Sequence, residues 1–224
     1  MKTLKELINL DEPGWELVSE WISQAENDFE ILPRASVRAE KELVNAQVTT
    51  RSPMGAVIYE TGGILIDHGW LRILGSGSKK LDRGLTIWNK GKTFENYGDQ
   101  PSHLLIADDI IGGYFALNAG GIGTEMGKVY YLAQDSLAWE CLDTSYSEFL
   151  YWAFTGDIDK FYKLFRWENW QNDIKVANGN QVFSFMPFLW TEEGKDIEKT
   201  TRALVPIEEN YRLTLDFQKQ FNGK

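Results

Sequence analysis

The chain has 224 residues, of which 23 are basic and 33 acidic, so its formal net charge is −10 at pH 7. A hydrophobic fraction of 43% and a charged fraction of 25% are typical of a globular protein and exclude a largely disordered chain. Cys141 is the only cysteine, which excludes an intramolecular disulfide and a zinc site built from several cysteines.

Two helices are predicted in the N-terminal part of the chain. Asp11 can cap the first, with Pro13 in its opening turn. Its buried stripe has helical spacing and consists of Trp15, Val18, Ile22 and Ala25. The second helix is expected from 33 to 46, a charged segment with few apolar residues to bury: Val37, Leu43 and Val44.

From Gly55 onward, short apolar runs separated by glycines predict an antiparallel sheet. The expected strands cover 56–59, 64–66, 70–74, 85–88, 104–107, 114–117, 128–133 and 138–142. Side chains alternate between the two faces of a strand. Phe115 and Leu117 therefore share one face, Tyr114 and Ala116 share the other, and one of these faces must meet a helix.

Two further helices are expected to cover this sheet. Ser145 and Glu148 match the capping box, in which each side chain accepts from the other residue's amide, and Gly156 can end that helix in a left-handed conformation. Asp157 can cap the next helix, which would extend to Phe165.

The C-terminal part predicts a strand at 181–185, a loop at 191–201 and a helix from Pro206 onward, although its apolar residues also alternate as in a strand. No linker rich in Pro, Ser or Gly divides the chain. We therefore expect a single domain over residues 1–224. Its fold class should be α+β, with a mostly antiparallel sheet packed by helices.

Motifs of known chemistries are incomplete. The glycine-rich stretch 120–128 would need glycine in place of Ile122 and a hydroxyl in place of Val129 to bind phosphate as a P-loop does. His68 and His103 are the only histidines, and neither H-E-x-x-H nor G-x-S-x-G occurs. We therefore expect no cofactor, no metal and no catalytic activity. Catalysis by paired carboxylates stays open, because 33 acidic residues allow many pairs.

Aromatic residues crowd the second half of the chain, and most should fill the core. An exposed aromatic patch rimmed by acids would be typical of a protein-binding or sugar-binding surface. Alternation turns Tyr114 and Tyr131 away from their apolar neighbours, and Asp108, Asp109 and Trp139 could lie near a cleft. These five residues are the candidate binding site.

We expect a non-catalytic protein-binding module. One alternative is an enzyme, or a binder of a small molecule or sugar, that uses a cleft of carboxylates and aromatic residues. The other alternative is a structural homo-oligomer.

The N-terminus and the charge predict a cytoplasmic protein. The first residues contain no apolar run fit for a signal peptide, and the longest apolar run, 149–154, is six residues, against the ~20 of a membrane span. A surplus of ten negative charges opposes contact with nucleic acid and favours a protein partner with a basic surface. No membrane partner is expected.

The segment from His103 to Gly156 resembles a known family. Its motifs are IADDIIGGYFALN at 106–118, GKVYYL at 127–132 and YSEFL at 146–150. Over nearly the whole chain the likeness is to a bacterial family, domain of unknown function 2625, which carries no assigned activity. The central segment is also similar to the SUKH superfamily of cell-wall regulators and toxin-immunity proteins. That second resemblance implies an α+β domain that binds other proteins, in many members a toxin that it neutralises, but the stretches before Leu104 and after Phe165 depart from its pattern.

Overall fold

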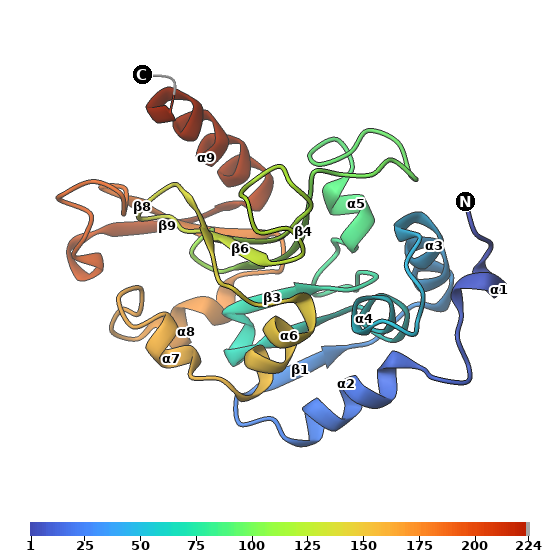
Figure 1. Ribbon diagram of the computed structural model, residues 1–224. Coiled ribbons are helices and arrows are strands. Elements are labelled where there is room, and N and C mark those ends of the chain that lie inside the picture. The colour runs from blue at the N-terminus through green and yellow to red at the C-terminus, as the bar shows by residue number, and fades with distance from the viewer. Residues whose placement is uncertain (223–224) are drawn as a thin grey trace.

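The computed structural model describes residues 1–222 and has an α+β fold, as the sequence predicts (Figure 1). Its main sheet is antiparallel, and its strands lie side by side in chain order. They are β1 (Phe29–Leu32), β2 (Gly63–Ile66), β3 (Leu71–Leu74), β4 (His103–Asp109), β5 (Tyr114–Asn118), β6 (Val129–Leu132) and β7 (Trp139–Cys141). A second sheet pairs β8 (Gln181–Met186) with β9 (Thr201–Pro206).

Helices lie on both sides of the main sheet. They are α1 (Leu4–Leu7), α2 (Gly14–Ser23), α3 (Ser36–Ala46), α4 (Pro53–Glu60), α5 (Leu85–Asn89), α6 (Tyr146–Thr155), α7 (Ile158–Phe161), α8 (Trp170–Asp173) and α9 (Ile207–Asn222). Short 3-10 turns occur at 67–69, 174–176 and 197–199. Across residues 1–222, the helices are too short or too polar to span a membrane.

The strand register aligns side chains in two rows that cross the whole main sheet. Row one consists of Glu30, Leu65, Arg72, Asp108, Tyr114, Leu132 and Trp139. Row two, on the opposite face, consists of Ile31, Ile64, Ile73, Ala107, Phe115, Tyr131 and Glu140. The Tyr114 ring of row one lies 4.8 Å from the ring of Tyr211 in α9, whereas Phe115 of row two lies 5.0 Å from Phe149 in α6. Both faces of β5 therefore meet a helix.

The strand predicted at 56–59 is wrong, because these residues lie in α4. The Ser52 hydroxyl accepts a hydrogen bond from the Gly55 amide and Pro53 opens the helix, which is a typical N-terminal signature. Ala56, Val57 and Ile58 are all fully buried. A short helix buried on all sides has no polar face, so its sequence resembles a buried strand.

Other local predictions also needed correction. The segment predicted as a strand at 85–88 forms α5, and the predicted second helix begins at Ser36 with Val37 80% exposed. Gly156 ends α6 with an extended backbone, at φ −84°, and not in the left-handed region. The strand β1 and most of β9 were not predicted. The four strands from β4 to β7, the capping box of α6 and the helical form of α9 are confirmed.

The capping box of α6 gives a first stability prediction. The Ser145 hydroxyl accepts from the Glu148 amide at 3.3 Å, and the Glu148 carboxylate accepts from the Ser145 amide at 2.7 Å. Ser145→Ala should therefore lower the free energy of unfolding in urea by about 1 kcal/mol. Ser147→Ala, inside the same helix, is the control and should change it by no more than a few tenths of a kcal/mol. Equal effects of the two substitutions would contradict the cap.

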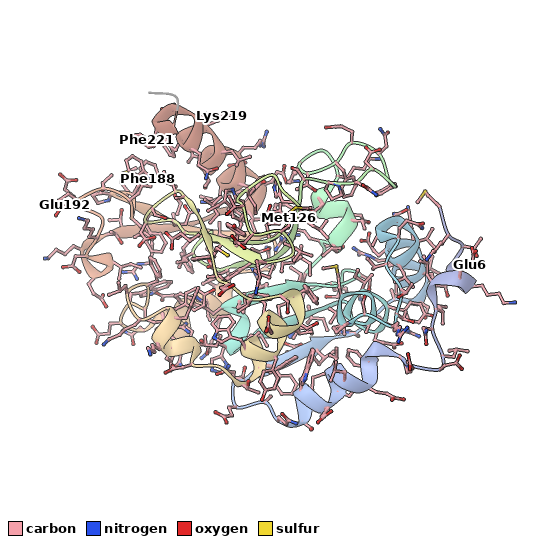
Figure 2. All side chains as sticks on the ribbon, viewed as in Figure 1. Glu6, Met126, Phe188, Glu192, Lys219 and Phe221 are labelled. Atoms are coloured by element: carbon pink, nitrogen blue, oxygen red, sulfur yellow. The ribbon has the colours of Figure 1, made fainter. Side chains whose placement is uncertain are left out.

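An aromatic cluster joins α9 to the loop that follows β8. Phe188 and Trp190 stack with ring centroids 5.5 Å apart, and Phe217 and Phe221 of α9 close the cluster. Figure 2 shows Phe188 and Phe221 near each other at the outer part of α9. Phe221 is 49% exposed, so this cluster is only partly covered.

Candidate functional site

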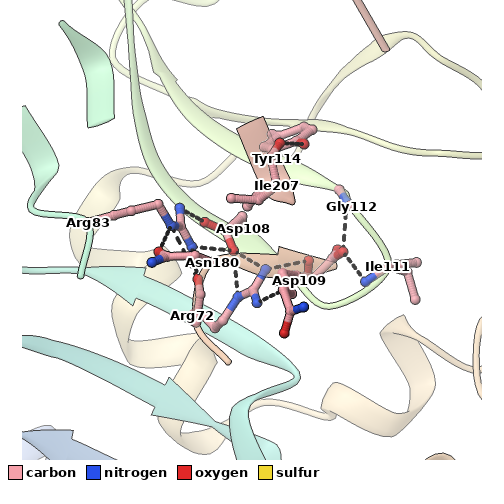
Figure 3. Close-up of polar contacts among 12 residues, drawn as sticks. Arg72, Arg83, Asp108, Asp109, Ile111, Gly112, Tyr114, Asn180 and Ile207 are labelled. Carbon is pink, nitrogen blue, oxygen red and sulfur yellow. Dashed lines mark hydrogen bonds and ion pairs between the residues drawn. The ribbon is translucent and has the colours of Figure 1, made fainter. Parts of the chain in front are cut away.

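The predicted site residue Asp108 is the centre of a buried charge cluster (Figure 3). Its Oδ1 accepts from Nε of Arg72 at 2.6 Å, and its Oδ2 accepts from Nη1 of Arg83 at 2.6 Å. Asp108 is 0% exposed, Arg72 2% and Arg83 6%. Burial lowers the pKa of Arg72, and the adjacent carboxylate opposes that shift. One buried carboxylate therefore pairs with two guanidinium groups that have almost no contact with water.

The same cluster connects the two sheets. Arg72 is the cross-strand partner of Asp108 in row one, while Arg83 comes from the segment that follows β3. Arg72 also donates to the Gln181 carbonyl at 2.6 Å, and Arg83 donates to the Gly179 carbonyl at 2.7 Å. These two hydrogen bonds connect β8 and the residues just before it with the main sheet.

Asp109 faces the opposite side of the sheet and fixes the turn between β4 and β5. Its Oδ1 accepts from the Ile111 and Gly113 amides at 3.1 and 2.7 Å. Its Oδ2 accepts from the hydroxyls of Tyr131 and Tyr162 at 2.7 and 3.2 Å. A Cβ at position 113 would overlap the Tyr131 hydroxyl and this carboxylate, so the turn requires glycine there. Burial raises the pKa of Asp109 to about 6.

Tyr114 and Tyr131 lie in the interior, and not on an exposed aromatic patch as the sequence had indicated. The Tyr114 hydroxyl donates to Oδ1 of Asn210 in α9 at 2.8 Å, and the Tyr131 ring stacks on Phe115 with centroids 4.5 Å apart. Burial raises the pKa of both tyrosines well above its usual value. Strand alternation predicts correctly which face of the sheet each tyrosine lies on, but helices cover both faces, so both tyrosines are buried.

Trp139 lies apart from the other four candidates, on the edge strand β7. It is half-buried, and its ring lies 5.9 Å from the ring of His103. Three strand spacings, about 14 Å in all, separate its strand from that of Asp108. The structure does not bring Trp139 and the two carboxylates to one cleft, because both carboxylates are fully buried. A binding role for Trp139 stays a prediction.

An apolar cavity of about 320 Å³ adjoins the edge strand. It is lined by Leu142, Thr144, Phe149, Trp152 and Phe161, which come from the segment after β7 and from α6 and α7. Within residues 1–222, β7 pairs with β6 alone, so its other edge has no strand partner. We call this unpaired edge with its cavity the β7 edge.

The β7 edge is acidic. Residues 133–159 contain six aspartates and glutamates and no lysine, arginine or histidine. Glu140 in the strand and Asp143 just after it are exposed, and Asp143 forms an ion pair with Lys128 at 3.1 Å. The charge run was visible in the sequence, but the strand order that leaves β7 unpaired was not.

Comparisons with known proteins place the chain in a family. Residues 4–210 match the family described as "Protein of unknown function DUF2625". A protein of Haemophilus influenzae, described as uncharacterized, is 47% identical over 222 residues, which cover 99% of this chain and 97% of that relative. The Escherichia coli K12 protein YbfG, also described as uncharacterized, is 40% identical over 221 residues, 99% of each chain. The SUKH likeness of the central segment stays a prediction.

Proposed function

We propose that this chain, which belongs to the protein family DUF2625 of unknown function, is a non-catalytic protein-binding module that takes an extended segment of its partner at the β7 edge. The observation that carries the proposal is a free, acidic edge strand beside an apolar cavity. Adding a strand to an exposed sheet edge is a recurrent way of binding peptides. Backbone hydrogen bonds then give affinity, and pockets for alternate side chains give specificity.

The backbone of β7 offers the groups that such a segment needs. In an antiparallel ladder, every second residue directs its N–H and C=O towards the same neighbouring strand. The Leu142 amide donates to the Val129 carbonyl of β6 at 2.9 Å, so Glu140, two residues earlier, also faces β6. The backbone groups of Trp139 and Cys141 therefore point outward, where unpaired groups favour an added strand.

Side chains at the β7 edge favour a partner segment that is apolar and basic. Glu140 belongs to row two, on the side of the sheet where Phe149 and Phe161 line the cavity. Alternate side chains of an added strand would point into this cavity, and the others would lie beside Trp139. The excess of acids across 133–159 attracts lysine and arginine. The immunity-type role implied by the SUKH resemblance would require that the partner be a toxin.

A proline at position 141 tests the proposal. Proline has no N–H and its ring obstructs an incoming strand, but the Cys141 N–H points away from β6, so the ladder of the sheet should survive. Cys141→Pro should weaken partner binding more than about tenfold. Cys141→Val is the matched control, because it also removes the thiol that accepts from the Asp143 amide but keeps the backbone donor.

The measurement is affinity capture with quantitative mass spectrometry from Haemophilus influenzae lysate, followed by titration of the purified partner. We expect a partner retained by the natural chain and by Cys141→Val and lost by Cys141→Pro, with slower amide hydrogen exchange at 139 and 141 in the complex. Equal capture by both variants, or a complex without protection there, would falsify the edge proposal. Homo-oligomerisation stays a prediction, which light scattering of the purified chain addresses.

A further inference from the structure

A second cavity, of about 390 Å³, lies at the other end of the main sheet. Its floor is the row-one face of β1 to β3, and its walls are formed by Lys79 and Lys80 and by residues 174–179, two segments that meet where the Gly179 amide donates to the Lys80 carbonyl at 3.0 Å. We call this cavity the basic groove. A wider hollow of about 730 Å³ shares Lys79, Lys80 and Asn178 with it, so the groove opens to solvent.

The topology explains why this part of row one is open. Over β3 to β5, row one is covered by β8 and α9, through the hydrogen bond of Arg72 to the Gln181 carbonyl and the contacts of Tyr114 with α9 described above. Among residues 1–222, none of these elements covers β1 and β2, so Glu30 is exposed and Leu65 is only half-buried. Arg72 marks the boundary, because it lines the groove and bonds to Asp108 and the Gln181 carbonyl at the same time.

The walls of the basic groove carry positive charge that is not neutralised locally. Lys80 is paired with Glu30 at 2.6 Å, and Arg72 is paired with Asp108. In the described part of the chain, Lys79 and Lys175 have no carboxylate within 4.0 Å. Two ammonium groups without a carboxylate partner therefore line a concave site in a chain whose net charge is −10, and that of Lys175 donates to Oδ1 of Asn172 at 3.0 Å. A cleft lined by one sign of charge concentrates ions of the opposite sign.

The floor adds an apolar surface. Leu65, Ile110, Ile174 and Ala177 line the groove beside the charged walls. A volume of about 390 Å³ lies within the range of cavities that hold small organic ligands. We infer that the basic groove binds an organic phosphomonoester, whose dianionic phosphate is held by Lys79 and Lys175 and whose apolar body lies on Leu65 and Ile174. The inference is independent of the β7 edge, which lies at the opposite end of the sheet.

Phenyl phosphate is the probe, because it combines a dianion with one apolar ring. Titration of the full chain, followed by amide NMR shifts, should give saturable changes at residues 65, 79 and 174–179. The double variant Lys79→Gln/Lys175→Gln should weaken binding by about tenfold or more. Both lysines are exposed, so the variant should fold. Lys219→Gln, on the distant outer part of α9 (Figure 2), is the matched control and should bind as the natural chain does.

Three simpler probes separate the parts of the inference. Inorganic phosphate lacks the ring, phenol lacks the charge and benzoate carries a single charge, so each should bind more weakly than phenyl phosphate. Equal affinity for inorganic phosphate would overturn the apolar half of the site, and equal affinity for benzoate would overturn the assignment to a dianion. Unchanged binding in the double lysine variant, or shifts confined to other residues, would overturn the site itself.

Discussion

Asp108→Ala should lower the free energy of unfolding by about 3–5 kcal/mol, because it leaves two buried guanidinium groups without their counterion. Arg72 and Arg83 both bond to this carboxylate at 2.6 Å, and none of the three side chains has appreciable contact with solvent. A loss of that size is a large share of the 5–15 kcal/mol that stabilises a typical domain. Urea unfolding followed by tryptophan fluorescence measures it.

An exposed ion pair provides the control for this prediction. Asp82 pairs with Arg38 at 2.5 Å, but its side chain is 65% exposed. Asp82→Ala should therefore cost less than about 1 kcal/mol. Asp108→Asn keeps the shape and one acceptor oxygen, but it removes the charge and replaces the other acceptor with an NH2 group, so its cost should fall between the two. A loss at Asp108→Ala as small as that at Asp82→Ala would show that water reaches the cluster and that burial does not set its strength.

The parts of the fold that the sequence predicted have strong local signals. The strands β4, β5 and β6 are separated by glycine-containing turns, and the Ser145 and Glu148 pair marks the start of α6. By contrast, α4 was mistaken for a strand because its residues 56–58 are all buried, so the helical period is invisible. The short strand β1 contains only four residues and lies directly before Pro33, which weakens both its pattern and its boundary.

The candidate site shows where sequence reasoning stops. Their adjacency in the sequence predicts that Asp108 and Asp109 lie near one cleft, yet strand alternation directs them to opposite faces and into different networks. A signal for the first network was present, because Arg72 interrupts the apolar run of β3 and a buried arginine requires a partner. Its partner could not be read, because strand order depends on contacts distant in sequence. The unpaired edge of β7 was invisible for the same reason.

Asp109→Asn should remove a pH dependence from the stability of the protein. The pKa of Asp109 is about 6 in the folded chain, against 3.8 for an ordinary aspartate. Between these values the folded state retains a proton that the unfolded state has lost, so stability falls as pH rises from about 4 to about 6 and is then flat. The shift corresponds to about 3 kcal/mol. Asparagine is neutral throughout, and its amide oxygen can still accept from the Ile111 and Gly113 amides.

The quantity to measure is the unfolding free energy of Asp109→Asn minus that of the natural chain. Between pH 4 and pH 7 this difference should rise by about 3 kcal/mol, because only the natural chain loses stability. Tyr131→Phe is the informative companion, because the Tyr131 hydroxyl donates to the ionised carboxylate and so lowers the Asp109 pKa. Without that donor the carboxylate should hold its proton to higher pH, and the fall in stability should extend above pH 6. A carbon-13 NMR titration of the Asp109 carboxyl gives the midpoint directly. Parallel pH profiles for all three chains would contradict this prediction. They would mean that the Asp109 pKa is the same in the folded and unfolded states, so that burial does not raise it.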